Sequence, residues 1–129
     1  MREYSMTLKV SESDLDELQH VNNIKYLEWI QDIAKGHWQT VTQDAYANEH
    51  VWVVRNHNIT YHRAAVLNDV VELKTYIESS IGAISTRIVE LKDHKSGHLF
   101  VTSKTEWCLL NTHNMKPTRI PDHIKSLFE

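Results

Sequence analysis

The sequence has little cysteine, proline or glycine: one, two and three residues respectively among 129. Because Cys108 is alone, it cannot form an internal disulfide, which is typical of proteins from a reducing compartment. A lone cysteine also cannot supply the grouped thiolates of a structural zinc site, and the nine histidines are scattered along the chain. We therefore expect neither a metal site nor a cofactor.

Long apolar runs and a surplus of positive charge are also missing. No uninterrupted apolar run approaches the length that spans a membrane, and Met1–Arg2–Glu3 does not resemble the start of a signal peptide. The formal net charge is −3 at pH 7, which argues against a dedicated nucleic-acid binder. We expect a single domain over residues 1–129, located in the cytoplasm, with no nucleic-acid or membrane partner.

The segment from Ser13 to Trp38 organises the rest of the chain. After Asn22–Asn23, apolar residues recur at three- and four-residue spacing, which predicts a long amphipathic helix capped by one of these asparagines. The apolar positions are Leu27, Ile30, Ala34, Trp38 and Val41, widened by Ile24, Tyr26, Trp29 and Ile33. This wide stripe predicts burial over most of the helix circumference, with fraying near Gly36 because glycine weakens a helix interior.

Five other segments alternate between apolar and polar residues, as half-buried β-strands do. They are residues 4–10, 51–63 with a bulge near 55–58, 70–81, 84–92 and 99–110. Residues 42–49 are expected to form a short helical piece or a loop, and residues 121–128 a short helix with Pro121 at its first position. Short turns between successive strands favour antiparallel neighbours, so we predict an α+β protein whose sheet curls about one helix.

Three motifs near the helix start carry a resemblance to a known family. They are Asp14–Leu15–Asp16, His20–Val21–Asn22–Asn23 and Tyr26–Leu27–Glu28–Trp29. Together they resemble the hotdog-fold thioesterases, and the segments 59–63 and 116–121 extend the similarity over most of the chain. Within that family the sequence is most similar to acyl-CoA thioesterases of the 4-hydroxybenzoyl-CoA thioesterase type and to acyl-acyl-carrier-protein thioesterases.

The resemblance implies a hotdog fold, in which a curved antiparallel sheet of about five strands wraps a long central helix. It also implies hydrolysis of an acyl thioester, from acyl-CoA or acyl-ACP, to a carboxylic acid and a free thiol. The active site is expected between two subunits of a homodimer or homotetramer.

Residue by residue, Asp16 matches the catalytic carboxylate of the family, which acts as general base or nucleophile. Asn23 matches the helix-start position whose main-chain N–H polarises the thioester carbonyl. Such chemistry is sensible at a helix N-terminus, which supplies oriented N–H groups and a positive dipole end. His20 matches the histidine of the acyl-carrier-protein branch, where a catalytic role and a loop-tying role are both open.

Three further residues are predicted to bind substrate. Asn22 is a candidate ligand, although capping the helix is the commoner role for such a residue. Tyr26 can line an acyl pocket or belong to the core. Arg63 suits the phosphates of coenzyme A, although an exposed arginine at a strand end is an equally good interpretation.

Departures from the acyl-carrier-protein branch favour acyl-CoA. Leu18 stands where that branch usually has an asparagine, and Ala64–Ala65 replace its Glu–Cys pair. Two other functions stay open at this point. One is a hydratase or dehydratase acting on 3-hydroxyacyl thioesters through His62 and Asp69, and the other is a non-catalytic acyl-CoA-binding protein.

Overall fold

The apolar stripe after Asn22 forms helix α1 (Asn23–Thr42) in the computed structural model, which describes residues 2–46 and 49–129. Asn22 caps this helix as predicted, because its side-chain oxygen accepts a hydrogen bond from the Ile24 amide at 3.0 Å. The predicted fraying near Gly36 is wrong, since α1 continues to Thr42. A Cβ atom at residue 36 would lie 3.3 Å from the Tyr4 hydroxyl, so the glycine allows close packing there.

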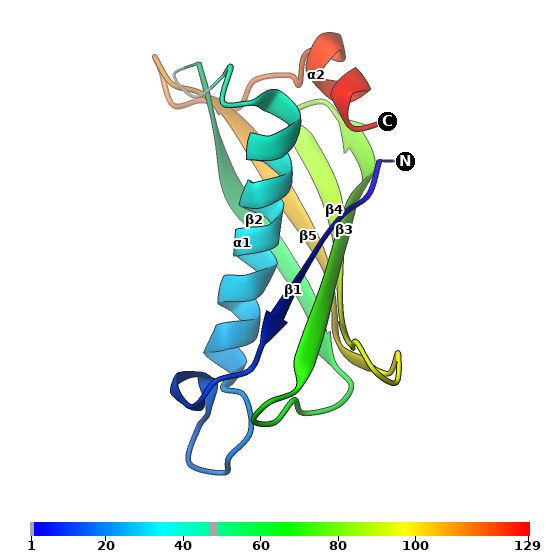
Figure 1. Ribbon diagram of the computed structural model, residues 1–129. Helices are drawn as coiled ribbons and strands as arrows, with labels where there is room; N and C mark the ends of the chain where they lie inside the picture. The colour runs from blue at the N-terminus through cyan, green and yellow to red at the C-terminus, as the bar shows by residue number, and fades with distance from the viewer. Residues whose placement is uncertain (1, 47–48) are drawn as a thin grey trace.

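Only one face of α1 is buried. Ile24 is 62% exposed, and the exposed positions also include Glu28, Asp32 and Lys35. The expected burial over most of the circumference is therefore wrong. The reason is visible in Figure 1, where the sheet curls along one side of α1 and leaves the opposite side uncovered. The buried helix residues are Tyr26, Trp29, Ile30, Ile33, Ala34, His37 and Thr42.

The described residues form one antiparallel sheet of five strands, in the spatial order β1-β3-β4-β5-β2. The strands are β1 (Tyr4–Lys9), β2 (His50–Tyr61), β3 (Val70–Ile81), β4 (Ile84–Asp93) and β5 (Leu99–Asn111). Their ends agree with the predicted ranges to within two residues. The predicted bulge in β2 is confirmed by a register shift between Val54 and Asn56. The two sheet edges are therefore β1 and β2.

Apolar side chains fill the space between α1 and the sheet in two clusters. The larger cluster packs Trp29 and Ile33 of α1 against Leu73 and Leu91 of the sheet. The smaller cluster joins Leu109 of β5 to the C-terminal helix α2 (Asp122–Leu127). These clusters hold α1 against the sheet at both ends.

The remaining connections agree with prediction in part. Pro121, predicted as the first helical residue, is instead the N-cap of α2, which begins one residue later at Asp122. Residues 43–46 form turns, and the predicted segment 42–49 also includes residues 47 and 48, which lie outside the described residues. Within the part of the chain that the structure describes, no helix is both long and apolar enough to cross a membrane.

Candidate active site

The segment that leads into α1 is held by backbone pairing on both sides. Leu15 pairs with Val21, and His20 pairs with Val66 in the connection between β2 and β3. The Val21 amide also donates to the Ala65 carbonyl at 2.9 Å. The chain reverses direction at Gln19, which adopts a positive φ of 62°. This turn brings Asp16 and His20 against the end of β2.

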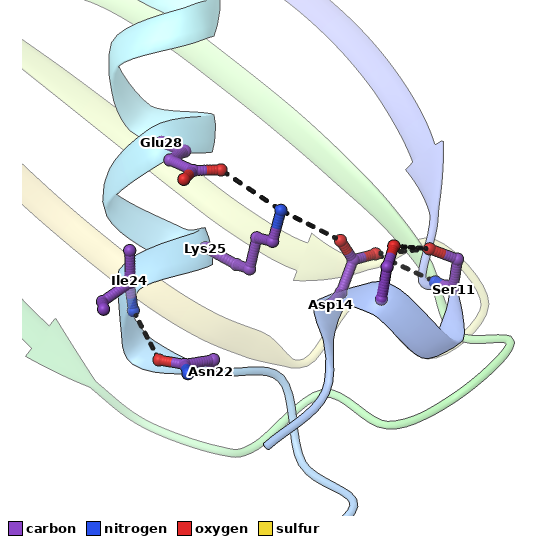
Figure 2. A network of polar contacts seen from close by, with 7 residues as sticks. Ser11, Asp14, Asn22, Ile24, Lys25 and Glu28 are labelled. Atoms are coloured by element: carbon purple, nitrogen blue, oxygen red, sulfur yellow. Dashed lines mark hydrogen bonds and ion pairs between the residues drawn. The ribbon is translucent and has the colours of Figure 1, made fainter.

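Asp14 connects the same segment to the first turn of α1 (Figure 2). Its Oδ2 atom accepts a hydrogen bond from the Ser11 amide at 2.9 Å, and its Oδ1 atom lies 3.8 Å from the Lys25 Nζ. Lys25 in turn pairs with Glu28 at 3.4 Å. Asp14 therefore braces the approach to the helix, within the 3-10 helix η1 (Glu12–Asp14).

A pocket of about 300 Å³ opens at the N-terminal end of α1. Its lining comes from the approach segment, from the first turn of α1 and from the end of β2. The lining residues are Asp16, His20, Val21, Asn23, Tyr26, Tyr61, His62, Arg63 and Ala64. The structure therefore brings together five of the predicted site residues. Asn22 is the exception, because it caps the helix and is not among the lining residues.

The carboxylate of Asp16 is oriented by one of its two oxygens. Oδ1 accepts hydrogen bonds from the amides of Leu18 at 2.9 Å and His20 at 3.3 Å. Every hydrogen bond that the described structure gives this carboxylate ends on Oδ1, so Oδ2 is the oxygen that remains for a ligand. Because Leu18 contributes its backbone amide, its side chain, which is 70% exposed, does not affect this arrangement.

The Asn23 amide is a free donor at the positive end of α1. Asn22 takes up the next two amides, because its side chain accepts from Ile24 at 3.0 Å and its carbonyl from Lys25 at 2.8 Å. Among the described residues, the Asn23 amide has no such acceptor. First-turn N–H groups lack intrahelical partners and sit where the helix dipole is positive. Asn23 lines the pocket, and the role of its amide as a donor to the thioester oxygen stays a prediction.

Tyr26 belongs both to the core and to the pocket wall. Its side chain is buried, and its hydroxyl oxygen accepts a hydrogen bond from the Ala65 amide at 2.9 Å. The ring packs edge-on against Trp29 and tilted against Tyr61, with centroids 5.6 and 5.9 Å away. Burial raises the pKa of the Tyr26 hydroxyl, which keeps it neutral. Tyr26 thus holds the β2–β3 connection against the helix start.

Arg63 lies exposed at the pocket rim. Its Nη1 atom lies 2.7 Å from the Nδ1 atom of His98, beside the hairpin loop between β4 and β5. His20 is also exposed, and its hydrogen bonds within the described chain run through its backbone to Asp16. The loop-tying role of residue 20 is therefore visible, while a catalytic role for its side chain stays a prediction.

The pair that the hydratase hypothesis uses is not assembled within one chain. The Nε2 atom of His62 lies 2.9 Å from the Thr102 hydroxyl. The Oδ2 atom of Asp69 accepts a hydrogen bond from the Val66 amide at 2.9 Å. Each group is therefore engaged by its own neighbour, and only His62 lines the pocket.

Some site features were not predicted. Tyr61 and Ala64 also line the pocket. Both lie within two residues of Arg63 in the sequence, and this proximity was the signal that could have pointed to them. A second unpredicted feature lies near the other end of α1, where the side chain of Arg87 is buried. The burial of Arg87 could have been predicted from its position in β4. Residues 85, 87, 89 and 91 occupy alternate positions and therefore share one face of the sheet, which is the buried face.

The sequence of the chain matches a known family over almost its whole length. The family described as "Acyl-ACP thioesterase N-terminal domain" matches residues 1–128. The chain belongs to this family. The resemblance to thioesterases seen in its motifs is therefore confirmed.

Two curated relatives show how far the similarity of this acyl-ACP thioesterase family member extends. The long-chain acyl-CoA thioesterase FadM of Escherichia coli is 32% identical over 92 residues, covering 66% of this chain and 67% of FadM. The chloroplastic dodecanoyl-[acyl-carrier-protein] hydrolase of Cinnamomum camphora is 30% identical over 98 residues, covering 74% of this chain. The matched region is only 22% of that plant relative, so the chain spans about a fifth of its length.

The fold of this family member is shared with solved structures. A hypothetical protein of Staphylococcus aureus, solved in complex with CoA, superposes with a TM-score of 0.89 at 16% identity. The superposition covers 98% of this chain and 81% of the other. The expected hotdog fold, with one long helix and a five-stranded antiparallel sheet, is confirmed.

Proposed function

We propose that this chain hydrolyses acyl thioesters, with acyl-CoA as the principal substrate, to a carboxylic acid and a free thiol. One observation carries the proposal: the Asp16 carboxylate and the unpaired Asn23 amide line the same pocket at the positive end of α1. Thioester hydrolysis needs a group that delivers an oxygen nucleophile and donors for the carbonyl oxygen. The names of the relatives, which are acyl-CoA and acyl-carrier-protein hydrolases, support the same reaction.

Each group has a defined task in this proposal. The Oδ2 atom of Asp16 either removes a proton from the attacking water or attacks the carbonyl carbon itself. The amide of Asn23, at the start of α1, stabilises the oxyanion that forms on the carbonyl oxygen. When water is the nucleophile, loss of the pantetheine thiolate, which takes up the proton, gives the carboxylic acid directly. When Asp16 is the nucleophile, loss of the thiolate leaves a mixed anhydride with Asp16, and a water molecule then hydrolyses this anhydride to release the acid.

Arg63 is proposed to hold the phosphates of coenzyme A. Its guanidinium is exposed at the rim of the pocket, and such groups bind phosphate oxygens through paired N–H donors. The CoA bound to the similar S. aureus structure supports this choice of substrate class. In an Arg63→Gln variant, the KM for an acyl-CoA should rise, while the KM for the matching acyl-N-acetylcysteamine, which lacks the phosphates, should not. An equal effect on both substrates would remove Arg63 from this role.

The assembly is proposed to be a homodimer joined through β2, or a homotetramer of such dimers. β2 is an open sheet edge that carries exposed apolar residues, among them Val53, Val54 and Tyr61. Since residues 61–64 line the pocket at the end of this strand, a partner paired along β2 would border the active site. Light scattering at micromolar concentration should give a dimer or tetramer, and a monomer would contradict the assembly. A cytoplasmic location belongs to the same proposal.

The central experiment measures thiol release from a panel of acyl-CoAs of different chain length. Asp16→Asn keeps the shape of the side chain but removes its basicity, and we expect turnover to fall by roughly 10²–10⁴-fold. Glu17→Gln, a change of the same kind at the exposed neighbouring position, should retain wild-type turnover.

Three results would contradict the proposal. Wild-type turnover in Asp16→Asn on every substrate would exclude the assigned role of Asp16. Tight acyl-CoA binding without thiol release by the folded wild type would indicate a binding protein. Enoyl absorbance from 3-hydroxyacyl-CoA without thiol release would indicate a hydratase.

A further inference from the structure

A second pocket, of about 100 Å³, lies near the C-terminal half of α1. The indole rings of Trp38, Trp52 and Trp107 line it together with Ala34, and the side chains of Lys35, Gln39, Ser85 and Arg87 complete the lining. Both pockets lie between α1 and β2, with Trp52 near the start of β2 and Tyr61 at its end. From Asn23 to Trp38 the helix rises by roughly 20 Å, so the two sites are well separated.

The unusual member of this lining is Arg87, whose side chain is only 5% exposed. No Asp or Glu of the described residues forms an ion pair with its guanidinium. The hydrogen bonds that it makes all leave from Nη1, to His37 Nδ1 at 2.8 Å and to the Thr75 hydroxyl at 3.1 Å. Both of these acceptors are neutral groups, because His37 is itself held uncharged by burial. The charge of Arg87 is therefore buried without an anion to balance it.

A buried cation without a counter-ion lowers the stability of the folded protein. Charged residues are rarely fully buried unless they are paired, because removing a charge from water without compensation destabilises the fold. Burial also lowers the pKa of Arg87, to about 10, with no carboxylate to oppose the effect. Trp52, in the same lining, is a second donor without an acceptor, because its buried Nε1 atom has no hydrogen-bond partner in the described structure.

We propose that this pocket binds a carboxylate carried on an apolar chain or ring, with the carboxylate oxygens on Arg87 and the apolar body against Trp38, Trp52 and Trp107. A carboxylate supplies both the missing negative charge and acceptors in the geometry that a guanidinium prefers. The indole walls explain why the ligand is not a bare inorganic anion, since they bury apolar surface. Two sources share this chemistry: a free carboxylic acid, and the distal carboxylate of a dicarboxylic acyl chain.

The test compares octanoate with octanamide, which has nearly the same shape but no charge. Three of the four tryptophans of the chain line the pocket, so their fluorescence reports binding directly, and calorimetry gives the same affinity independently. We expect wild type to bind octanoate at least about tenfold more tightly than octanamide, because a charge-assisted hydrogen bond is worth roughly twice a neutral one. Equal binding of the two probes, or binding of neither, would overturn the proposal.

Two variants locate the preference within the pocket. Arg87→Met should abolish the octanoate preference, while Lys35→Met, which removes an exposed cation from the same lining, should keep it. The opposite pattern would assign the preference to Lys35 and overturn the proposal. Because the wild-type comparison needs no variant, the test remains decisive even if Arg87→Met fails to fold.

A last measurement distinguishes a free carboxylic acid from the distal carboxylate of an acyl chain. This measurement is the one that rests on the proposed hydrolysis. If the distal carboxylate of a substrate reaches Arg87, kcat/KM for hexadecanedioyl-CoA should exceed that for hexadecanoyl-CoA, because a sixteen-carbon chain is long enough to span the separation of the two pockets. The ratio should fall to about one in Arg87→Met. A ratio of one in wild type, with octanoate preference intact, assigns the site to a free acid. Failure to hydrolyse any acyl-CoA of the panel contradicts the proposed function, whereas the octanoate measurement still decides the pocket.

Discussion

The Nη1 atom of Arg87 in β4 lies 2.8 Å from the Nδ1 atom of His37 in α1, and both side chains are buried. Since Nδ1 accepts the hydrogen bond, the proton of the neutral imidazole belongs on Nε2, which is buried without a partner in the described structure. The imidazole ring is stacked on Tyr4 and meets Phe128 edge-on, with centroids 5.4 and 4.9 Å away. This cluster connects the C-terminal half of α1 to the sheet and, through Tyr4 and Phe128, to both ends of the chain.

The pH dependence of stability should report this contact. Burial, with a further contribution from the Arg87 charge, lowers the pKa of His37 to about 4, from 6.5. Between these values the unfolded chain binds a proton at residue 37 and the folded chain does not, so stability falls as the pH drops from 6.5 to 4. We expect this one group to remove up to about 3 kcal/mol from the free energy of unfolding by pH 4.

The measurement is urea unfolding of wild type and His37→Gln at several pH values between about 7 and 4. The free-energy difference between wild type and variant should shrink steadily as the pH falls, because the substituted glutamine side chain does not titrate. The same series with His113→Gln, at an exposed position, is the control and should show no such trend. A difference between wild type and His37→Gln that is independent of pH would contradict the prediction.

Tyr26→Phe should destabilise the protein through a single lost acceptor. The Ala65 amide, in a residue with 0% exposure, would keep its burial but lose the Tyr26 hydroxyl. Leaving a buried donor unsatisfied costs about 1–3 kcal/mol, which a shift in the urea midpoint would show. Tyr76→Phe is the matched control, since the described structure records no hydrogen bond for that hydroxyl, and it should change stability by less than about 0.5 kcal/mol. Equal effects of the two substitutions would rule out the explanation.

Substitutions at Asn22 should separate capping from substrate binding. Asn22→Ala removes the acceptor for the Ile24 amide and should cost about 1 kcal/mol of stability. Asn22→Ser retains a good neutral cap and should restore most of that loss, which thermal and urea unfolding can measure. If residue 22 acts only as a cap, thiol release by the serine variant should also match wild type. A stable serine variant with much reduced activity would show instead that the asparagine side chain contacts the substrate.

Much of the fold was readable from local patterns. The apolar residues at three- and four-residue spacing after Asn22 predicted α1, and strict alternation in residues 70–81 predicted β3 over its observed range. Gly82 and Gly97 lie in the gaps between the alternating segments 70–81, 84–92 and 99–110, and both have positive φ, as turn glycines often do. These signals were reliable because hydrogen bonds and side-chain direction within a helix or strand depend on near neighbours in sequence.

The grouping of the candidate site residues around one pocket was readable for a different reason. Asp16, His20 and Asn23 lie within eight residues of each other, so a turn and a helix start are enough to bring them to one pocket. Ile24 illustrates the limit of this reasoning, because the helical stripe assigned it to the core. Whether a helix residue is covered depends on how far the sheet curls around the helix, and periodicity does not contain that information.

The sequence by itself determined which segments are helix or strand, and it grouped Asp16 with Asn23 at the helix start, since both follow from residues close together in the chain. Only the tertiary structure decided which side of α1 is covered, why Gly36 is tolerated, and that Arg87 meets His37 beside an indole-lined pocket. Those features come from contacts between residues about 30 to 50 positions apart. Their energies depend on the distance and burial that folding imposes, and no local pattern encodes either quantity.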